Sequence, residues 1–353
     1  MIEKSLIDLY DLELNDIEKL IDLALKIKKN PEKYMDYCHG KIMATLFYEP
    51  STRTQMSFKT AMLRLGGQVI GFDDPKNSSV AKGENLKDTI KIFANYADII
   101  VIRHPFEGTA FAASQFIDTP IINAGDGGHM HPTQTLTDVV TLKSEKGRLD
   151  NLKIGLCGDM LNGRTVHSLI KTMSRYENNR FYIISAKELA LPEYVEDFMK
   201  ERNIKFTYSD AIEDCIGDLD VLYMTRIQKE RFDSEEEYQK QKGLFILTKD
   251  KLKQAKDDMI IMHPLPKIDE IEIEVDDDER AKYFEQAKNG MYARMALIIK
   301  MLDTDQNRPI NYKNSEIKCN NPKCITNKET YLENLVVTNG KDKYCAYCDS
   351  KIK

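Results

Sequence analysis

The sequence lacks several features that would assign the chain to a common class. It contains no run of about 18 apolar residues, so no membrane-spanning segment is expected. The N-terminal segment is acidic and has no long apolar stretch, which argues against a signal or transit peptide and favours a cytoplasmic protein. Neither a G-x-x-x-x-G-K-[ST] run nor a G-x-G-x-x-G run after a strand is present. A P-loop and a nicotinamide site are therefore not expected.

The charge of the chain is unevenly distributed. The protein has 353 residues, and at about 150 residues per domain this length suggests two domains and a small extra one. The net charge is −6, but residues 308–353 contain nine Lys/Arg and five Asp/Glu, so they carry +4 and residues 1–307 carry −10. The acidic body argues against nucleic-acid binding through bulk charge. The change of sign marks a boundary near residue 308.

Short apolar segments alternate with amphipathic segments throughout the acidic body. Residues 15–28 have helical spacing, with Asn15 and Glu18 as a capping pair, and residues 53–65 also predict a helix. Residues 41–47 predict a buried strand. Further strands are expected over residues 68–72, 98–103, 120–125, 153–159, 180–185, 220–226 and 259–266. This alternation predicts parallel sheets covered by helices, whose ligands bind at the carboxyl ends of the strands.

The segment at residues 49–54, EPSTRT, follows the first predicted strand and opens a helix. Free backbone N–H groups and the helix dipole favour an anion at such a position. Three hydroxyl groups and one guanidinium add side-chain donors. The alternative interpretation is an ordinary helix cap beside a surface arginine, and this segment alone does not decide between the two.

Other predicted strands end in matching side chains. A lone arginine or histidine at such a place is usually structural. Several of them at the ends of parallel strands, together with the segment at 49–54, predict a site for polyanionic substrates. These side chains are Arg103, His131, Arg164, Arg226 and His263.

These motifs together resemble the catalytic chain of aspartate carbamoyltransferase over roughly residues 3–305. The related ornithine enzymes share the STRT run but resemble one another in an H-C-L-P run where this chain has HPLP at 263–266. Aspartate is therefore the expected acceptor, and another amine is the alternative. The runs that carry the resemblance are FYEPSTRTQMSF, SSVAKGENLKDT, IRHPFEGTA, NAGDGGHMHPTQTLTD, GDMLNGRTVHSL, YMTRIQKERF, MHPLPKIDEI and AKYFEQAKNGMYARMAL.

The resemblance implies transfer of a carbamoyl group from carbamoyl phosphate to L-aspartate, without a covalent intermediate and without an organic cofactor. It implies that Thr54, Arg103 and His131 polarise the carbonyl oxygen and that Gln134 contacts the carbamoyl amide. It assigns phosphate binding to four consecutive residues, Ser51, Thr52, Arg53 and Thr54.

The resemblance also implies an aspartate site, with Arg164, Arg226 and Gln228 on the carboxylates. Backbone carbonyl groups of Leu265 and Pro266 complete that site.

A further implication is a homotrimer with shared active sites, in which Lys82 and the nearby Ser78 reach in from the neighbouring subunit. Glu49 is expected to pair with Arg164 and Arg231 when the domains close. The sequence leaves open whether trimers pair. His129 is expected to be a loop residue outside the site.

Four cysteines crowd the last part of the chain in two close pairs. The pairs enclose four and two residues and are separated by twenty, a spacing typical of tetrahedral zinc. Free or disulfide-linked thiols are the alternative. Four sulfurs leave no open position, so one structural Zn²⁺ per chain is expected, and it should be needed to order so short a segment. The predicted ligands are Cys319, Cys324, Cys345 and Cys348.

The cysteine segment resembles the zinc domain of the aspartate carbamoyltransferase regulatory chain, here fused to a catalytic chain. The family's nucleotide-binding domain has no room before the first cysteine, so this chain alone should not respond to ATP or CTP. A non-catalytic scaffold that contacts nucleic acid is the rival of a different class.

We expect an α/β protein with two doubly wound parallel-sheet domains of transcarbamylase type and a small C-terminal zinc-bound β domain. The expected division is a carbamoyl phosphate domain at 1–133 with 286–307, an aspartate domain at 134–285 and a zinc domain at 308–353.

Overall fold

The computed structural model divides into two compact units. Unit 1 comprises Met1–Leu136 and Gly290–Lys353, and unit 2 comprises Thr137–Asn289. Each unit is built on a parallel sheet, and unit 1 also carries a small antiparallel sheet. The structure describes residues 5–226, 234, 236, 245–304, 312–340 and 342–352.

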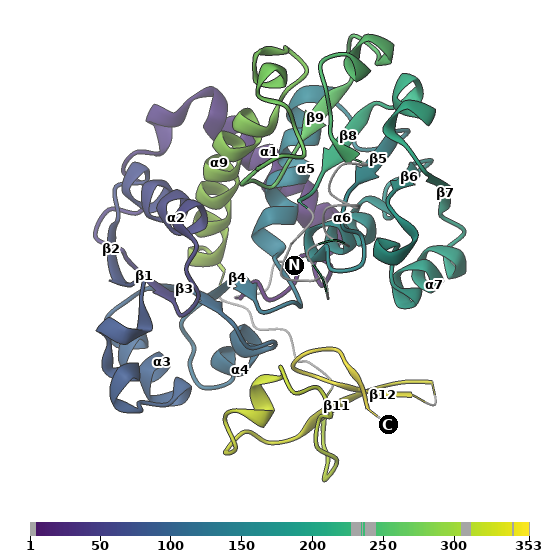
Figure 1. The fold of residues 1–353 in the computed structure, drawn as a ribbon. Coiled ribbons are helices and arrows are strands. Elements are labelled where there is room, and N and C mark those ends of the chain that lie inside the picture. The colour runs from purple at the N-terminus through teal and green to yellow at the C-terminus, as the bar shows by residue number, and fades with distance from the viewer. Residues whose placement is uncertain are drawn as a thin grey trace. The chain divides into compact units, whose positions relative to one another are not determined.

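The parallel sheet of unit 1 has the strand order β2-β1-β3-β4 (Figure 1). From β1 the chain moves outward to β2 and then returns to the other side of β1 for β3, so the winding direction reverses between β1 and β3. A ligand site is expected at this switch point, outside the carboxyl ends of the strands. The strands are β1 (Ile42–Phe47), β2 (Gln68–Phe72), β3 (Ile99–His104) and β4 (Ile121–Asp126).

Helices connect these strands and cover the sheet. Two of the helices, α5 and α9, run from one unit into the other, since the division falls within their residue ranges. The helical elements are α1 (Leu14–Lys29), η1 (Pro31–Tyr34), α2 (Thr52–Arg64), η2 (Pro75–Asn77), η3 (Ser79–Lys82), α3 (Leu86–Ala94), α4 (Thr109–Ser114), α5 (Pro132–Lys146) and α9 (Tyr283–Leu302).

The first elements lie where the sequence pattern predicts them, with one error of detail. The helix expected over 15–28 is α1, and its buried stripe includes Ile17, Leu20 and Ile21. The predicted capping pair is wrong, because the helix already begins at Leu14. Asn15 therefore lies inside the first turn, where its side chain cannot occupy the cap position.

Unit 2 repeats the doubly wound design with the strand order β7-β6-β5-β8-β9. Its winding direction reverses between β5 and β8, which places the second switch point there. Its elements are β5 (Lys153–Cys157), α6 (Arg164–Met173), β6 (Arg180–Ile184), η4 (Lys187–Leu189), α7 (Glu193–Glu201), β7 (Lys205–Ser209), η5 (Ile212–Asp214), η6 (Ile216–Asp218), β8 (Val221–Met224), η9 (Lys251–Gln254), β9 (Ile260–Met262) and η10 (Ile273–Asp277).

The C-terminal module, residues 312–340 and 342–352, is an antiparallel sheet of short strands within unit 1. It lies beside α4 in Figure 1. Ile325, Leu335 and Tyr347 of the module belong to the same buried apolar cluster as Phe111 of α4, so the module extends the core of unit 1. Its elements are β10 (Lys313–Asn314), η11 (Ile325–Asn327), β11 (Leu335–Asn339), β12 (Asp342–Cys345) and β13 (Lys351–Ile352).

The apolar residues of the described chain are used in cores around the sheets. In unit 2 a buried cluster joins β5, β8 and β9 through Cys157, Leu222 and Ile261. No helix in the described ranges has both the length and the apolar character needed to cross a membrane.

Candidate active site and metal centre

The carboxyl ends of β1 and β3 bring three predicted site segments together in unit 1. Residues 49–54 follow β1, Arg103 is the next-to-last residue of β3, and His131 comes between β4 and α5. Since β1 pairs with β3 and β3 pairs with β4, these segments lie at neighbouring strand ends. The sheet therefore collects cationic and hydroxyl side chains at the switch point.

Arg103 is the centre of this group and is buried, with 8% of its surface exposed. Its Nη2 lies 3.2 Å from Glu49 Oε2, and its Nη1 donates to the carbonyl of Ala124 at 3.3 Å. Its Nη1 also lies 3.4 Å from His131 Nε2. Because a guanidinium only donates, the imidazole nitrogen must be the acceptor in this contact.

Gly125 allows the loop after β4 to approach this guanidinium. Its φ of +122° is a conformation that side chains rarely adopt, and a Cβ at this position would lie 3.0 Å from Arg103 Nη1. Any larger residue would therefore strain the backbone and push the guanidinium aside. The glycine fixes the distance between the β4 loop and Arg103.

The N-terminus of α2 does not behave as an ordinary capped helix. Ser51 occupies the N-cap position with φ of −157°, yet its side chain makes no capping hydrogen bond. Thr54 is buried, whereas Thr52 and Arg53 are exposed. The capping alternative is thus not supported, and the first N–H groups of the helix keep their capacity to bind an anion.

The remaining predicted residues of unit 1 lie in local turns. Ser78 caps η3, since its hydroxyl accepts from the Val80 N–H at 3.3 Å and donates to the Pro75 carbonyl at 2.8 Å. Lys82 is exposed and pairs with no carboxylate in the described part of the chain. Gln134 is half-buried near the start of α5.

Unit 2 places its predicted residues at its own switch point. Arg164 is the first residue of α6, which follows β5, and Arg226 comes two residues after β8; both are half-buried. Leu265 follows β9 with φ of +54°, and its peptide bond to Pro266 is cis. Gln228 and Arg231 lie outside the described residues.

His263 and Glu270 hold the turn that carries Leu265. The Leu265 N–H donates to His263 Nδ1 at 2.8 Å, and His263 Nε2 lies 2.7 Å from Glu270 Oε1. Burial alone would raise the pKa of Glu270, but its contact with His263 holds that pKa below the usual value. Glu270 therefore remains a charged acceptor that orients the imidazole. The run MHPLPKIDEI contains both His263 and Glu270, but the sequence gave Glu270 no role.

His104 has a structural role beside the site. Burial lowers its pKa to about 3, so the imidazole is neutral. Its Nδ1 accepts from the Phe106 N–H at 3.1 Å and lies 3.0 Å from the Thr109 hydroxyl. The neutral ring thus shapes the turn that leads from β3 into α4.

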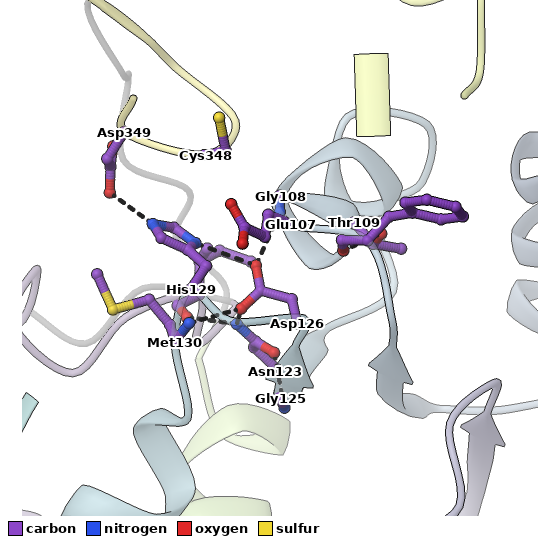
Figure 2. A network of polar contacts seen from close by, with 12 residues as sticks. Glu107, Gly108, Thr109, Asn123, Gly125, Asp126, His129, Met130, Cys348 and Asp349 are labelled. Atoms are coloured by element: carbon purple, nitrogen blue, oxygen red, sulfur yellow. Dashed lines mark hydrogen bonds and ion pairs between the residues drawn. The ribbon is translucent and has the colours of Figure 1, made fainter. Parts of the chain in front are cut away.

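His129 has a role that the sequence did not indicate. Its Nδ1 lies 3.2 Å from Asp126 Oδ2, and its Nε2 lies 3.1 Å from Asp349 Oδ2 (Figure 2). Burial alone would lower the pKa of His129, but the two carboxylates raise it well above its usual value. The residue is on a loop, as expected, and it links that loop to the C-terminal module as an imidazolium.

The four C-terminal cysteines form a cluster that could hold a metal ion. All four are buried, and their Sγ atoms lie within 4.8 Å of one another. Cys319 and Cys348 are separated by 3.6 Å between sulfurs, and Cys324 and Cys345 by 3.8 Å. Four sulfurs placed tetrahedrally at about 2.3 Å from one ion would be about 3.8 Å apart, so the donor set fits a tetrahedral metal.

The other three cysteines do not resemble nucleophiles. Cys38, Cys157 and Cys215 are buried, and burial raises the pKa of all three thiols, to about 11 for Cys38 and Cys215. Such thiols stay protonated at neutral pH and are poor nucleophiles.

The C-terminal module binds the body through main-chain groups. The Glu107 N–H donates to the Lys323 carbonyl and the Ile325 N–H donates to the Glu107 carbonyl, each at 2.9 Å. The Glu107 side chain accepts from Asn321 Nδ2 at 2.7 Å. A parallel bridge thus joins Glu107 to the first cysteine pair, at Cys324.

Gly108 permits a second close approach. Its φ is +81°, and a Cβ there would lie 2.5 Å from the carbonyl oxygen of Tyr347. The Tyr347 ring packs edge-on against Phe111, with centroids 5.2 Å apart. The second cysteine pair is therefore pressed against the start of α4.

The module also reaches the N-terminus of α3. The Leu86 N–H donates to Glu329 Oε1 at 3.3 Å, and the Lys87 N–H donates to the Tyr331 hydroxyl at 3.0 Å. A carboxylate at a helix N-terminus also complements the helix dipole. The module thus caps the helix that follows the Ser78–Lys82 turn.

Two family models match consecutive parts of this chain. The model described as the carbamoyl-P binding domain of aspartate/ornithine carbamoyltransferase matches residues 4–144. The model described as the Asp/Orn binding domain of the same enzymes matches residues 150–301. Both matches end before the first cysteine of the four-cysteine cluster.

Individual relatives agree with these models. The aspartate carbamoyltransferase catalytic subunit of Clostridium novyi is 57% identical over 302 residues, which cover 86% of this chain and 99% of the relative. The catalytic subunit of aspartate transcarbamoylase from M. jannaschii superposes with a TM-score of 0.82 at 49% identity, covering 85% of this chain and 98% of the other.

A third relative was solved with ligands. Aspartate transcarbamoylase from Trypanosoma cruzi in complex with carbamoyl phosphate and aspartate matches with a TM-score of 0.78 at 36% identity. The match covers 84% of this chain and 94% of the other.

Proposed function

This chain belongs to the aspartate carbamoyltransferase catalytic-subunit family, and from this premise we propose that it transfers the carbamoyl group of carbamoyl phosphate to the α-amine of L-aspartate. The products are N-carbamoyl-L-aspartate and phosphate, a step of pyrimidine synthesis in the cytoplasm. The observation that carries the proposal is the buried Arg103, held between Glu49 and His131 at the β1–β3 switch point.

The reaction needs no protein nucleophile, because the aspartate amine attacks the carbonyl carbon directly. The C–N bond forms, the C–O bond to phosphate breaks, and the leaving phosphate takes the proton that the amine loses. The protein contributes orientation and stabilises negative charge on the carbonyl oxygen and on the phosphate. No organic cofactor enters this scheme.

Carbamoyl phosphate is proposed to bind at the β1–β3 switch point. The open N-terminus of α2 supports phosphate binding, and the hydroxyls and guanidinium of its first turn supply further donors. Thr54, Arg103 and His131 would polarise the carbonyl oxygen, with Gln134 on the amide. The phosphate-binding residues are Ser51, Thr52, Arg53 and Thr54.

Glu49 acts as a counter-ion of Arg103 before substrate arrives, since the two side chains lie 3.2 Å apart. An incoming anion competes for this guanidinium and releases the carboxylate. The released Glu49 is then available to pair with Arg164 and Arg231 when the domains close, which excludes water from a labile acyl phosphate.

L-aspartate is proposed to bind at the switch point of unit 2. Arg164 and Arg226 would hold the carboxylates together with Gln228. The turn after β9, oriented by His263, would offer the backbone carbonyls of Leu265 and Pro266.

The test is carbamoylation by purified protein, comparing L-aspartate with L-ornithine as acceptors. We expect product with aspartate alone. Product with ornithine alone would reassign the acceptor. No product with either amine, from metal-replete protein, would favour the non-catalytic scaffold.

We further propose a homotrimer that shares its active sites through Lys82 and Ser78. Supporting observations are the exposed, unpaired ammonium of Lys82 among the described residues and the exposed apolar side chains of Met56 and Leu63, which lie seven residues apart on α2. Trimers refolded from a mixture of Lys82→Ala and Arg53→Ala chains should regain activity that neither variant has alone. A mixture as inactive as its components would contradict shared sites.

The metal is proposed to be one structural Zn²⁺ per chain, held by four thiolates with no open position.

The C-terminal module, at 308–353, is proposed to be a fused domain of the regulatory-chain type, next to a carbamoyl phosphate domain at 1–133 with 286–307 and an aspartate domain at 134–285. It is also proposed to join or brace catalytic trimers, so removal of residues 309–353 should change the size of the assembly. An unchanged size would contradict that role.

A further inference from the structure

We propose that Asp349, in the C-terminal module, is a positioning residue for the carbamoyl phosphate site and acts through His129 and Asp126. This inference rests on the proposed function, because the group it positions is the His131 and Arg103 pair assigned to carbamoyl phosphate. Figure 2 shows His129 between the two carboxylates, with contacts to both.

Asp126 is the fixed end of this contact. Its carboxylate accepts from the Gly108 N–H at 2.8 Å, from the Met130 N–H at 3.0 Å and from Asn123 Nδ2 at 3.3 Å. Its own N–H donates to the Met130 carbonyl at 3.2 Å. These bonds close residues 126–130 into a loop around the carboxylate of Asp126. Asp126 is buried, with 2% of its surface exposed.

The closed loop ends next to the proposed catalytic histidine. His131 directly follows Met130, and its Nε2 lies 3.4 Å from Arg103 Nη1. On the other side of the loop, Gly125 approaches the same guanidinium. A shift of the 126–130 loop would therefore move both groups that polarise the substrate carbonyl.

Asp349 ties this loop to the four-cysteine cluster. It directly follows Cys348, has φ of +55°, and its N–H donates to the Cys345 carbonyl at 3.0 Å. Its carboxylate is thus oriented by the turn between Cys345 and Cys348 and points at His129 Nε2 (Figure 2). The Asp349 side chain is 68% exposed, so it contributes little to the core of the module. The orientation of this exposed side chain is therefore better explained by its contact with His129 than by packing within the module.

The first experiment compares Asp349→Asn with the wild type. The substitution keeps the shape of the side chain and removes the negative charge that faces His129 Nε2. We expect the KM for carbamoyl phosphate to rise by about two- to fivefold, the range of a partly exposed ion pair. The KM for L-aspartate should be unchanged, because its proposed side chains lie in unit 2. Inorganic phosphate lacks the carbonyl oxygen assigned to His131 and Arg103, so its Kd in calorimetric titration should stay at the wild-type value. The metal content should also equal that of the wild type.

Asp342→Asn is the matched control. Asp342 is another carboxylate of the module, and it pairs with Lys351 at 2.7 Å rather than with the body. Its removal should change neither the KM for carbamoyl phosphate nor the phosphate Kd. An equal effect of both substitutions would overturn the proposal, since it would indicate a general loss of negative charge.

A double-mutant cycle tests the route through His129. His129→Ala should raise the KM for carbamoyl phosphate by about tenfold, because it leaves Asp126 without a charged donor. Adding Asp349→Asn to that variant should change nothing more. Additive effects, or wild-type constants in Asp349→Asn, would overturn the proposal. A wild-type protein that binds neither carbamoyl phosphate nor phosphate would instead overturn the proposed function, and this inference with it.

Discussion

The catalytic body and the C-terminal module reach an ordered structure by different means. The body buries apolar strands and helices around two parallel sheets, and its site residues come from strand ends that the sheets hold in place. The module has short antiparallel strands, the short helix η11, a four-cysteine cluster and a few apolar side chains that join the core of unit 1. The body is therefore expected to fold without a metal, whereas the module needs both the metal and the body.

The difference shows where each part is vulnerable. In the body, a single substitution at a strand end is expected to remove a proposed catalytic group and to leave the fold intact. In the module, loss of one cysteine is expected to remove the metal on which its order is proposed to depend. At the boundary, Glu107 and Gly108 of the body contact the module directly, so a change there should affect both parts.

The largest expected effect is on the module alone. Cys324→Ser, or removal of the metal by a chelator, should abolish protection from hydrogen exchange over residues 312–352, because structural zinc contributes on the order of 10 kcal/mol to such segments. Protection of β1 and β3 should persist. Cys215→Ser, a buried cysteine of unit 2, is the control and should leave the module protected. Loss of protection in both regions together would show that the body also depends on the metal.

The next effect is on the body alone. Arg103→Ala should lower turnover at least about 100-fold, as removal of an oxyanion donor does. Steady-state kinetics at saturating substrates measure it, and hydrogen exchange in the module should not change. The control is Arg202→Ala, an exposed arginine 3.9 Å from Glu201. Near-normal turnover of Arg103→Ala would remove the central element of the proposed site.

A smaller effect is expected at the boundary. Gly108→Ala places a Cβ 2.5 Å from the Tyr347 carbonyl oxygen at a positive φ. The contact between the body and the C-terminal module should therefore be destabilised by about 1–3 kcal/mol. Gly340→Ala is a matched control, since Gly340 also has positive φ but has open space around it. Hydrogen exchange at the Ile325 and Glu107 amides measures the difference. Equal exchange in the two variants would mean that backbone strain, not the close approach, decides the result.

The last prediction is that nucleotides have no effect on this chain. The purified chain should bind neither CTP nor ATP, because no stretch between the catalytic body and the cysteines can form a nucleotide-binding domain. Isothermal titration calorimetry with CTP tests this directly. Tight binding would contradict this prediction and would place a nucleotide site in the body or the module.

Much of the fold could be predicted, because local patterns dictate it. β3 is buried throughout, and its apolar run ends at Arg103, as the sequence suggested. The cysteine cluster was also predictable, since each pair of ligands lies within one short turn. The predicted cap of α1 was wrong, because polar residues such as Asn15 and Glu18 fit the first turn of a helix as well as its cap.

Contacts between distant segments left no such signal. His129 meets Asp349 across 220 residues of sequence, and Glu270 supports His263 through a turn whose shape depends on β9. A histidine on a polar loop resembles any surface histidine until the partner is placed beside it. The roles of these residues depend on tertiary contact, so the sequence alone predicted candidate catalytic groups but not the groups that orient them.

The bridge between Glu107 and Cys324 consists of peptide N–H and carbonyl groups. Every residue type except proline supplies both groups, so most substitutions on the two joined surfaces leave the bridge intact. A module joined in this way should tolerate extensive change in the facing side chains, and Gly108 should be the position least able to accept a larger residue. Divergent relatives that carry a similar module should therefore retain a small residue there even where the facing side chains have changed.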